Sequence, residues 1–93
     1  MKSGTVSRKK KVSFTLEAGE CHDVFIAGSF NNWDPQATPM MPVGGDGLYK
    51  ASLTLPKGSY EYKFVVDGNW QVDPSNANSV ANGAGSQNSV INV

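Results

Sequence analysis

Three segments of this chain alternate apolar and polar residues with a period of two, and this pattern restricts the possible folds more than any other feature. The segments are residues 12–16, 49–55 and 60–66. A period of two places every apolar side chain on one face of an extended strand, whereas an amphipathic helix needs a period of 3.6. No segment shows helical periodicity, so we expect strands that each bury one face.

Shorter runs rich in Val, Ile or aromatic residues predict further strands at 23–27, 70–72 and 89–93. Asp67-Gly68 predicts a two-residue hairpin loop, and the Asn- and Gly-rich stretch 74–88 predicts turns. Many short strands separated by turns are typical of an all-β fold, and at this size we predict an immunoglobulin-like antiparallel β-sandwich.

Size and charge narrow the classes of partner. A chain of 93 residues suits one small domain, and Cys21 is the only cysteine, which excludes an internal disulfide and favours a cytoplasmic protein. No apolar run or secretion signal indicates a membrane partner. From residue 12 onward the chain has three basic and eight acidic residues, and this net negative charge would repel nucleic acid. Residues 1–10 are expected to be a basic, disordered tail, and residues 11–93 the sandwich domain.

Catalytic chemistry finds little support in the sequence. Cleavage of a glycosidic bond needs two carboxylates, but Asp34, Asp67 and Asp73 each stand beside Pro or Gly, where aspartate shapes turns. Cys21 and His22 are adjacent, so on a strand their side chains point to opposite faces. We therefore predict that the chain is not an enzyme and needs no metal or cofactor.

Two tryptophans, Trp33 and Trp70, occupy turn-like settings where a large ring is expected to be exposed. A flat aromatic face suits the C–H surface of a sugar ring. Lys63 should point away from the core, on the same side as Glu61 and Val65, and can approach Trp70 across the predicted hairpin. Each residue also has a purely structural interpretation. A single tryptophan is more often packed against the protein than a binding residue, and a single surface lysine is usually just solvated. An asparagine such as Asn88 often closes a turn.

Four ordered motifs carry a resemblance to a known family: GSFNNW at 28–33, YEYKFVVDGNW at 60–70, DP at 73–74 and NSVINV at 88–93. From about residue 11 to its end, the chain resembles carbohydrate-binding module family 48. This is the glycogen-binding domain type of AMP-activated protein kinase beta subunits, related to N-terminal modules of branching and debranching enzymes such as isoamylase.

The resemblance implies a sandwich that binds α-1,4-glucans, namely glycogen, starch and maltooligosaccharides. It implies that Trp33 and Trp70 stack on glucose rings and that Lys63, Ser86 and Asn88 contact sugar hydroxyls. Asn31, Asn32, Asp34 and Pro35 are interpreted as the scaffold that holds Trp33. Ala84 stands where kinase-type modules have a bulky aliphatic residue, so that contact is expected to be weakened or absent.

Two functions stay open at this point. The first is a non-catalytic module that brings itself, or an associated glucan-metabolising enzyme or kinase, onto the polymer. The second is an immunoglobulin-like interaction or packing module, associated with an amylolytic enzyme or kinase, that does not bind sugar itself. The presence of Trp33, Lys63, Trp70 and Asn88 together favours the first, because a module that only packs needs no such set.

Overall fold

Strands make up all the regular structure in the part of the chain that the structure describes. The structure is a computed structural model and describes residues 9–19, 23–44, 47–81 and 86–93. The strands are β1 (Lys10–Glu17), β2 (Val24–Gly28), β3 (Met41–Val43), β4 (Leu48–Leu55), β5 (Ser59–Val66), β6 (Asn69–Gln71), β7 (Ser79–Ala81) and β8 (Gln87–Asn92). Within these ranges no helix is long and apolar enough to cross a membrane. The predicted all-β class is confirmed.

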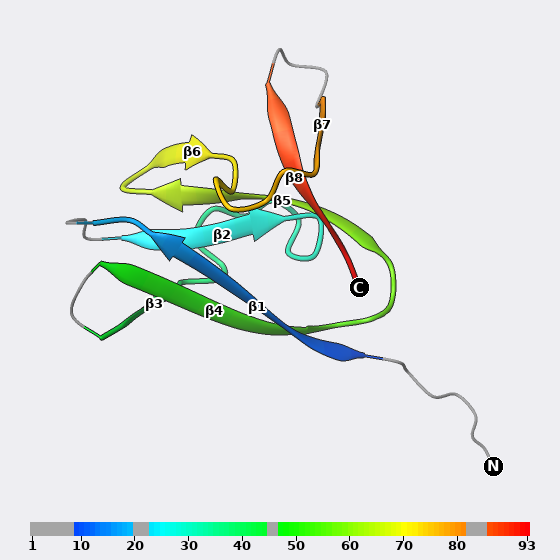
Figure 1. Cartoon of the computed structure of the whole chain (residues 1–93), viewed down its shortest axis with the longest axis horizontal. Helices are drawn as coiled ribbons and strands as arrows, with labels where there is room; N and C mark the ends of the chain where they lie inside the picture. Colours follow the sequence, from blue (N-terminus) through cyan, green and yellow to red (C-terminus); the bar gives the residue numbers. More distant parts are fainter. Residues whose placement is uncertain (1–8, 20–22, 45–46, 82–85) are drawn as a thin grey trace.

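The strands form two antiparallel sheets. One has the order β1-β4-β3, and the other has the order β2-β5-β8-β7 with β6 paired to β5. In Figure 1 the first sheet lies below and the strands β2, β5 and β6 lie above it. Strand β5 organises the second sheet because its first half pairs with β8 and its second half with β6, while β2 runs along its other side.

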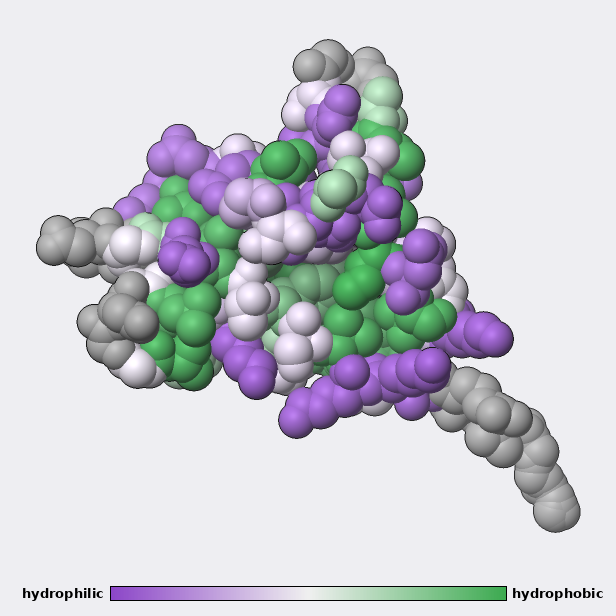
Figure 2. Space-filling view, in the orientation of Figure 1, coloured by the Kyte–Doolittle hydropathy of each residue, from purple (hydrophilic) through white to green (hydrophobic). Residues whose placement is uncertain are grey.

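The core lies between the two sheets, and the predicted alternation explains which side chains fill it. Phe14 of β1, Ile26 of β2, and Tyr62 and Phe64 of β5 all point inward. The Tyr62 ring meets Phe14 edge to face at 4.9 Å between centroids and Phe64 at 5.7 Å. Figure 2 shows hydrophobic residues between the two layers of strands and hydrophilic residues around them. The inward-facing residues thus hold the sheets together as a sandwich.

The outer edge of β2 is covered by the segment that leads to the other sheet. The amide of Ile26 donates to the carbonyl of Thr38 at 3.0 Å, and the amide of Met40 donates to that of Val24 at 2.8 Å. Phe25 and Pro39 form a bridge between these two bonds. The chain then enters β3 in the opposite sheet, so the edge of β2 is satisfied by its own chain.

Two strands, β3 and β7, were not predicted. Each has three residues, all exposed, so neither has the alternation that reveals a half-buried strand. Strand β7 lies within the stretch 74–88 for which only turns were expected, and it forms because its residues pair with β8. Strand β1 begins at Lys10, the last position of the expected tail. Residues 1–8, Cys21, His22 and Ala84 lie outside the described residues.

Candidate functional site

The candidate site lies on the side of the second sheet that faces away from the core. Because Tyr62 and Phe64 point inward, Glu61, Lys63 and Val65 point outward. Trp70 lies directly opposite Val65 in the register, so it shares their side of the sheet. We call this surface the outer face.

The last strand also contributes to the outer face. Val90 pairs with Glu61, and Asn88 lies two residues before Val90, so both point outward. Asn88 is largely covered, with 8% of its surface exposed. The register therefore brings residues of β5, β6 and β8 together.

A tight hairpin holds Trp70 in place, as the sequence predicted. Asp67 and Gly68 have φ angles of 47° and 85° and connect the paired residues Val66 and Asn69. The Asp67 carboxylate accepts a bond from the amide of Asp23 at 2.8 Å, and the Asp67 amide donates to the Asp23 carbonyl at 2.8 Å. These bonds tie the turn to the beginning of β2 and fix the start of β6.

Trp33 projects from a loop with an unusual backbone conformation. Asn32 and Trp33 both have a φ of 58°, in the left-handed region that residues other than glycine rarely adopt. The amide of Trp33 donates to the carbonyl of Gly28 at 2.9 Å. Successive residues in this conformation need support from their surroundings.

The side chain of Asn31 supplies that support. Its Oδ1 accepts a bond from the amide of Gly28 at 3.0 Å, and its Nδ2 donates to the carbonyl of Ile26 and to Oγ1 of Thr38, each at 3.0 Å. Asn31 thus joins β2, the loop and the segment covering the edge of β2. These contacts agree with its interpretation as a scaffold for Trp33.

The two indole rings lie beside each other. Their centroids are 6.5 Å apart and their planes are inclined by 38°. Trp70 is 46% exposed, as expected, whereas Trp33 was expected to be exposed and is only partly so, with its indole beside that of Trp70. Together they present two aromatic surfaces at an angle to each other, which fits a curved ligand better than a flat one.

The polar residues of the outer face form two hydrogen-bonded pairs. Nζ of Lys63 donates to Oγ of Ser86 at 2.7 Å, and Nδ2 of Asn88 donates to Oε1 of Glu61 at 2.9 Å. Because a carboxylate can only accept, Glu61 determines which end of the Asn88 amide faces it. The sequence placed Glu61 on this face but did not reveal its partner, which is 27 residues away.

Beneath the outer face, a buried network fixes the segment that follows Trp70. The hydroxyl of Tyr62 donates to Oδ2 of Asp73 at 2.6 Å and accepts a bond from Nδ2 of Asn76 at 3.1 Å. The amide of Asp73 donates to Oγ of Ser89 at 2.8 Å. Burial above all, and then the bond to Asp73, raise the pKa of Tyr62 well above its usual value. The predicted outward direction of Lys63 places its neighbour Tyr62 on the core side, but the sequence did not reveal this network.

The three aspartates considered for catalysis bond to backbone amides in turns. Asp34 accepts from the amide of Gln36 at 2.9 Å, and Asp73 accepts from that of Ser75 at 2.8 Å. Asp67 accepts from Asp23 in the same way. These contacts fit the prediction that the aspartates shape the backbone. The outer face instead combines aromatic surface with donors and acceptors, which is the chemistry that recognises a ligand with apolar faces and a hydroxyl rim.

Comparison with known proteins agrees with this geometry. Residues 11–93 match the family described as the glycogen recognition site of AMP-activated protein kinase. The chain is 44% identical over 71 residues to the 5'-AMP-activated protein kinase subunit beta-2 of Mus musculus, covering 76% of this chain and 25% of the subunit. It is 38% identical over 71 residues to subunit beta-1 of Sus scrofa, covering 76% of this chain and 54% of that protein.

A plant protein shows a shorter match. The chain is 44% identical over 52 residues to Protein PTST homolog 2, chloroplastic, of Arabidopsis thaliana, covering 56% of this chain and 9% of that protein. The chain thus spans only part of the length of each of these relatives. The resemblance to carbohydrate-binding module family 48 is confirmed, and with most of its residues matched the chain belongs to the family of glycogen recognition domains of AMP-activated protein kinase.

Proposed function

We propose that this chain is a non-catalytic module that binds α-1,4-glucans, such as glycogen, starch and maltooligosaccharides, on its outer face. Trp33 and Trp70 stack on glucose rings, and Lys63, Ser86 and Asn88 bond to the hydroxyls around them. The observation that carries the proposal is the pair of indoles, 6.5 Å apart and inclined by 38°, beside the polar pairs of the same sheet. An α-1,4-linked chain curves, and two inclined planes can contact successive parts of that curve.

Stacking supplies most of the binding energy in this proposal. Covering roughly 50–100 Å² of apolar surface on each indole contributes on the order of 1–3 kcal/mol at about 25 cal/mol per Å². The ordering of the sugar and of the side chains opposes this gain. A short oligosaccharide is therefore expected to bind with a Kd in the range of roughly micromolar to millimolar, and a polymer more tightly through multiple contacts.

The two hydrogen-bonded pairs of the outer face hold donors and acceptors in position for the hydroxyl groups of a sugar. An ammonium group has three donors, so Lys63 can keep its bond to Ser86 and still donate to a sugar oxygen. Glu61 holds the Asn88 amide in one orientation, so this group need not be ordered again when a ligand arrives. We add Glu61 to the proposed site as a positioning residue.

In a cell, the module would bring itself or an associated protein onto glycogen or starch. Among the relatives, the subunits of AMP-activated protein kinase support a kinase as the associated protein, and the chain spans only part of each of them. We propose a glucan-metabolising enzyme or a kinase as the protein partner, and a cytoplasmic location.

A titration with maltoheptaose tests the function. Tryptophan fluorescence and the amide signals near Trp33, Lys63 and Trp70 should shift, whereas cellohexaose, with its straight β-1,4 chain, should leave them unchanged. Trp70→Ala should abolish binding. The matched control is Met41→Ala, which removes an apolar side chain that is 62% exposed on the other sheet. Full-strength binding by a folded Trp70→Ala variant would contradict the site, whereas no response of the unchanged protein to maltoheptaose would contradict the function and favour the packing module.

A further inference from the structure

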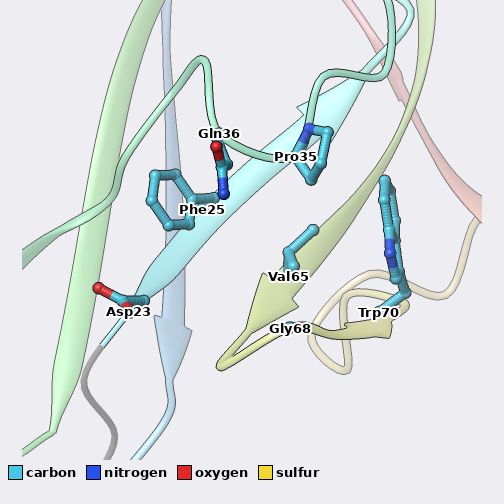
Figure 3. Close-up of a pocket in the computed structure, with 7 residues that line it drawn as sticks. All are labelled: Asp23, Phe25, Pro35, Gln36, Val65, Gly68 and Trp70. Atoms are coloured by element: carbon cyan, nitrogen blue, oxygen red, sulfur yellow. The ribbon is translucent and has the colours of Figure 1, made fainter.

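A hollow of about 240 Å³ lies beside Trp70. Figure 3 shows Val65 in the middle of it, with Phe25 on one side, Trp70 on the other and Pro35 above. Phe25 and Gln36 continue the lining toward β2. Trp33, Lys63, Ser86 and Asn88 are not part of this lining, so the hollow is a separate feature that shares only Trp70 with the proposed site.

The chemistry of the lining matches that of a single sugar ring. Val65, which is 4% exposed, forms an apolar floor, and the rings of Pro35 and Trp70 form apolar walls. Gln36 adds a carboxamide, and Asp23 lies at the end of the hollow near the beginning of β2. The volume is below the roughly 300–1,000 Å³ typical of pockets for drug-sized ligands, so it suits one ring rather than several.

We propose that this hollow is an accessory subsite for one further glucose unit of the same α-glucan chain. The inference rests on the proposed function, because its occupant reaches the hollow from the tryptophan pair. Trp70 borders both places, so a chain lying on the pair passes the mouth of the hollow. Gln36 donates to and accepts from the hydroxyls of the added unit, and Pro35 covers one face of its ring.

The subsite makes the affinity depend on chain length. A short oligosaccharide occupies the tryptophan pair alone, whereas a longer one also fills the hollow. Gln36→Ala should therefore weaken the binding of maltoheptaose by about two- to tenfold, the effect of losing one hydrogen bond, and leave maltotriose unchanged. Gln71→Ala is the matched control, since Gln71 is exposed on β6 but pairs with Phe64 and so points to the other side of the sheet from Trp70.

Calorimetric titrations of the full chain and both variants test this, together with amide spectra of the unchanged protein. Support requires that maltoheptaose shifts the amide signals of Phe25 and Gln36, that maltotriose does not, and that only Gln36→Ala loses affinity. If maltoheptaose moves the Trp70 signals but not those of Phe25 and Gln36, and Gln36→Ala binds it normally, the accessory subsite is wrong and the proposed function stands. If no glucan moves the Trp70 signals, the proposed function fails and the subsite with it.

Discussion

Replacement of the buried Tyr62 by phenylalanine should change how the stability of the domain responds to alkaline pH. The Tyr62 hydroxyl is buried and donates to the Asp73 carboxylate, so its pKa in the folded protein lies well above the unfolded value of about 10. Below pH 10 the hydroxyl keeps its proton in both states and adds no pH dependence. Above about pH 10 the unfolded chain loses this proton while the folded domain retains it.

The sign and size of the effect follow from that difference. Since the unfolded state then binds fewer protons, the free energy of unfolding falls as the pH rises, by up to about 1.4 kcal/mol per pH unit from this group. Tyr62→Phe removes the contribution. It should also cost about 1–3 kcal/mol at pH 7, because the buried Asp73 carboxylate loses its closest donor.

The stabilities of the two proteins should therefore differ most near neutral pH and converge above pH 10. Urea unfolding followed by tryptophan fluorescence, at intervals from pH 7 to about pH 11.5, measures both curves. Titrations of the other tyrosines and of the lysines occur in both proteins and cancel in the difference. Curves that stay parallel across this range would refute the link between Tyr62 ionisation and folding.

Three further changes test the supports of the site. Asn31→Ala removes three hydrogen bonds and should lower the free energy of unfolding, measured in urea, by about 2–4 kcal/mol. It should also weaken maltoheptaose binding, because Trp33 is no longer held in place, and unchanged affinity would contradict the role of Asn31 as a scaffold. Gly28→Ala would put a Cβ 2.5 Å from a backbone oxygen of β5 and should lower the Tm by several degrees, and an unaltered melting curve would argue against this close contact. Asp67→Ala removes the acceptor for the Asp23 amide and places alanine at a φ of 47°, and it should cost about 1–3 kcal/mol in urea unfolding. No loss there would show that the turn does not depend on this aspartate.

The elements that could be predicted from the sequence are those whose burial leaves a pattern in it. Strands β1, β4 and β5 alternate because one face of each meets the core, and Asp67-Gly68 marks its hairpin by a local requirement for positive φ angles. Strands β3 and β7 have no buried face, so their pairing with longer neighbours left no trace in composition or periodicity.

Within the candidate site, the direction of Lys63 and the hairpin before Trp70 could be predicted, but not how the residues are arranged. The neighbouring positions of Trp33 and Trp70 depend on the left-handed loop after β2 and on the register of β6, which are set by contacts distant in sequence. The pairing of Glu61 with Asn88 and that of Tyr62 with Asp73 likewise join separate segments. The hollow beside Trp70 is lined by residues from β2, from the loop after Trp33 and from the β5–β6 hairpin, so no local sequence pattern indicates it.

The left-handed conformation at Asn32 and Trp33 lowers the stability of the fold but keeps the Trp33 indole in position for a ligand. Each such residue costs of the order of 1–3 kcal/mol, and glycine at position 32 would relieve part of that cost. The same exchange would let the loop sample other shapes, so the indole would spend less time in its place beside Trp70. Variants selected only for thermal resistance should therefore accumulate changes here that reduce ligand affinity.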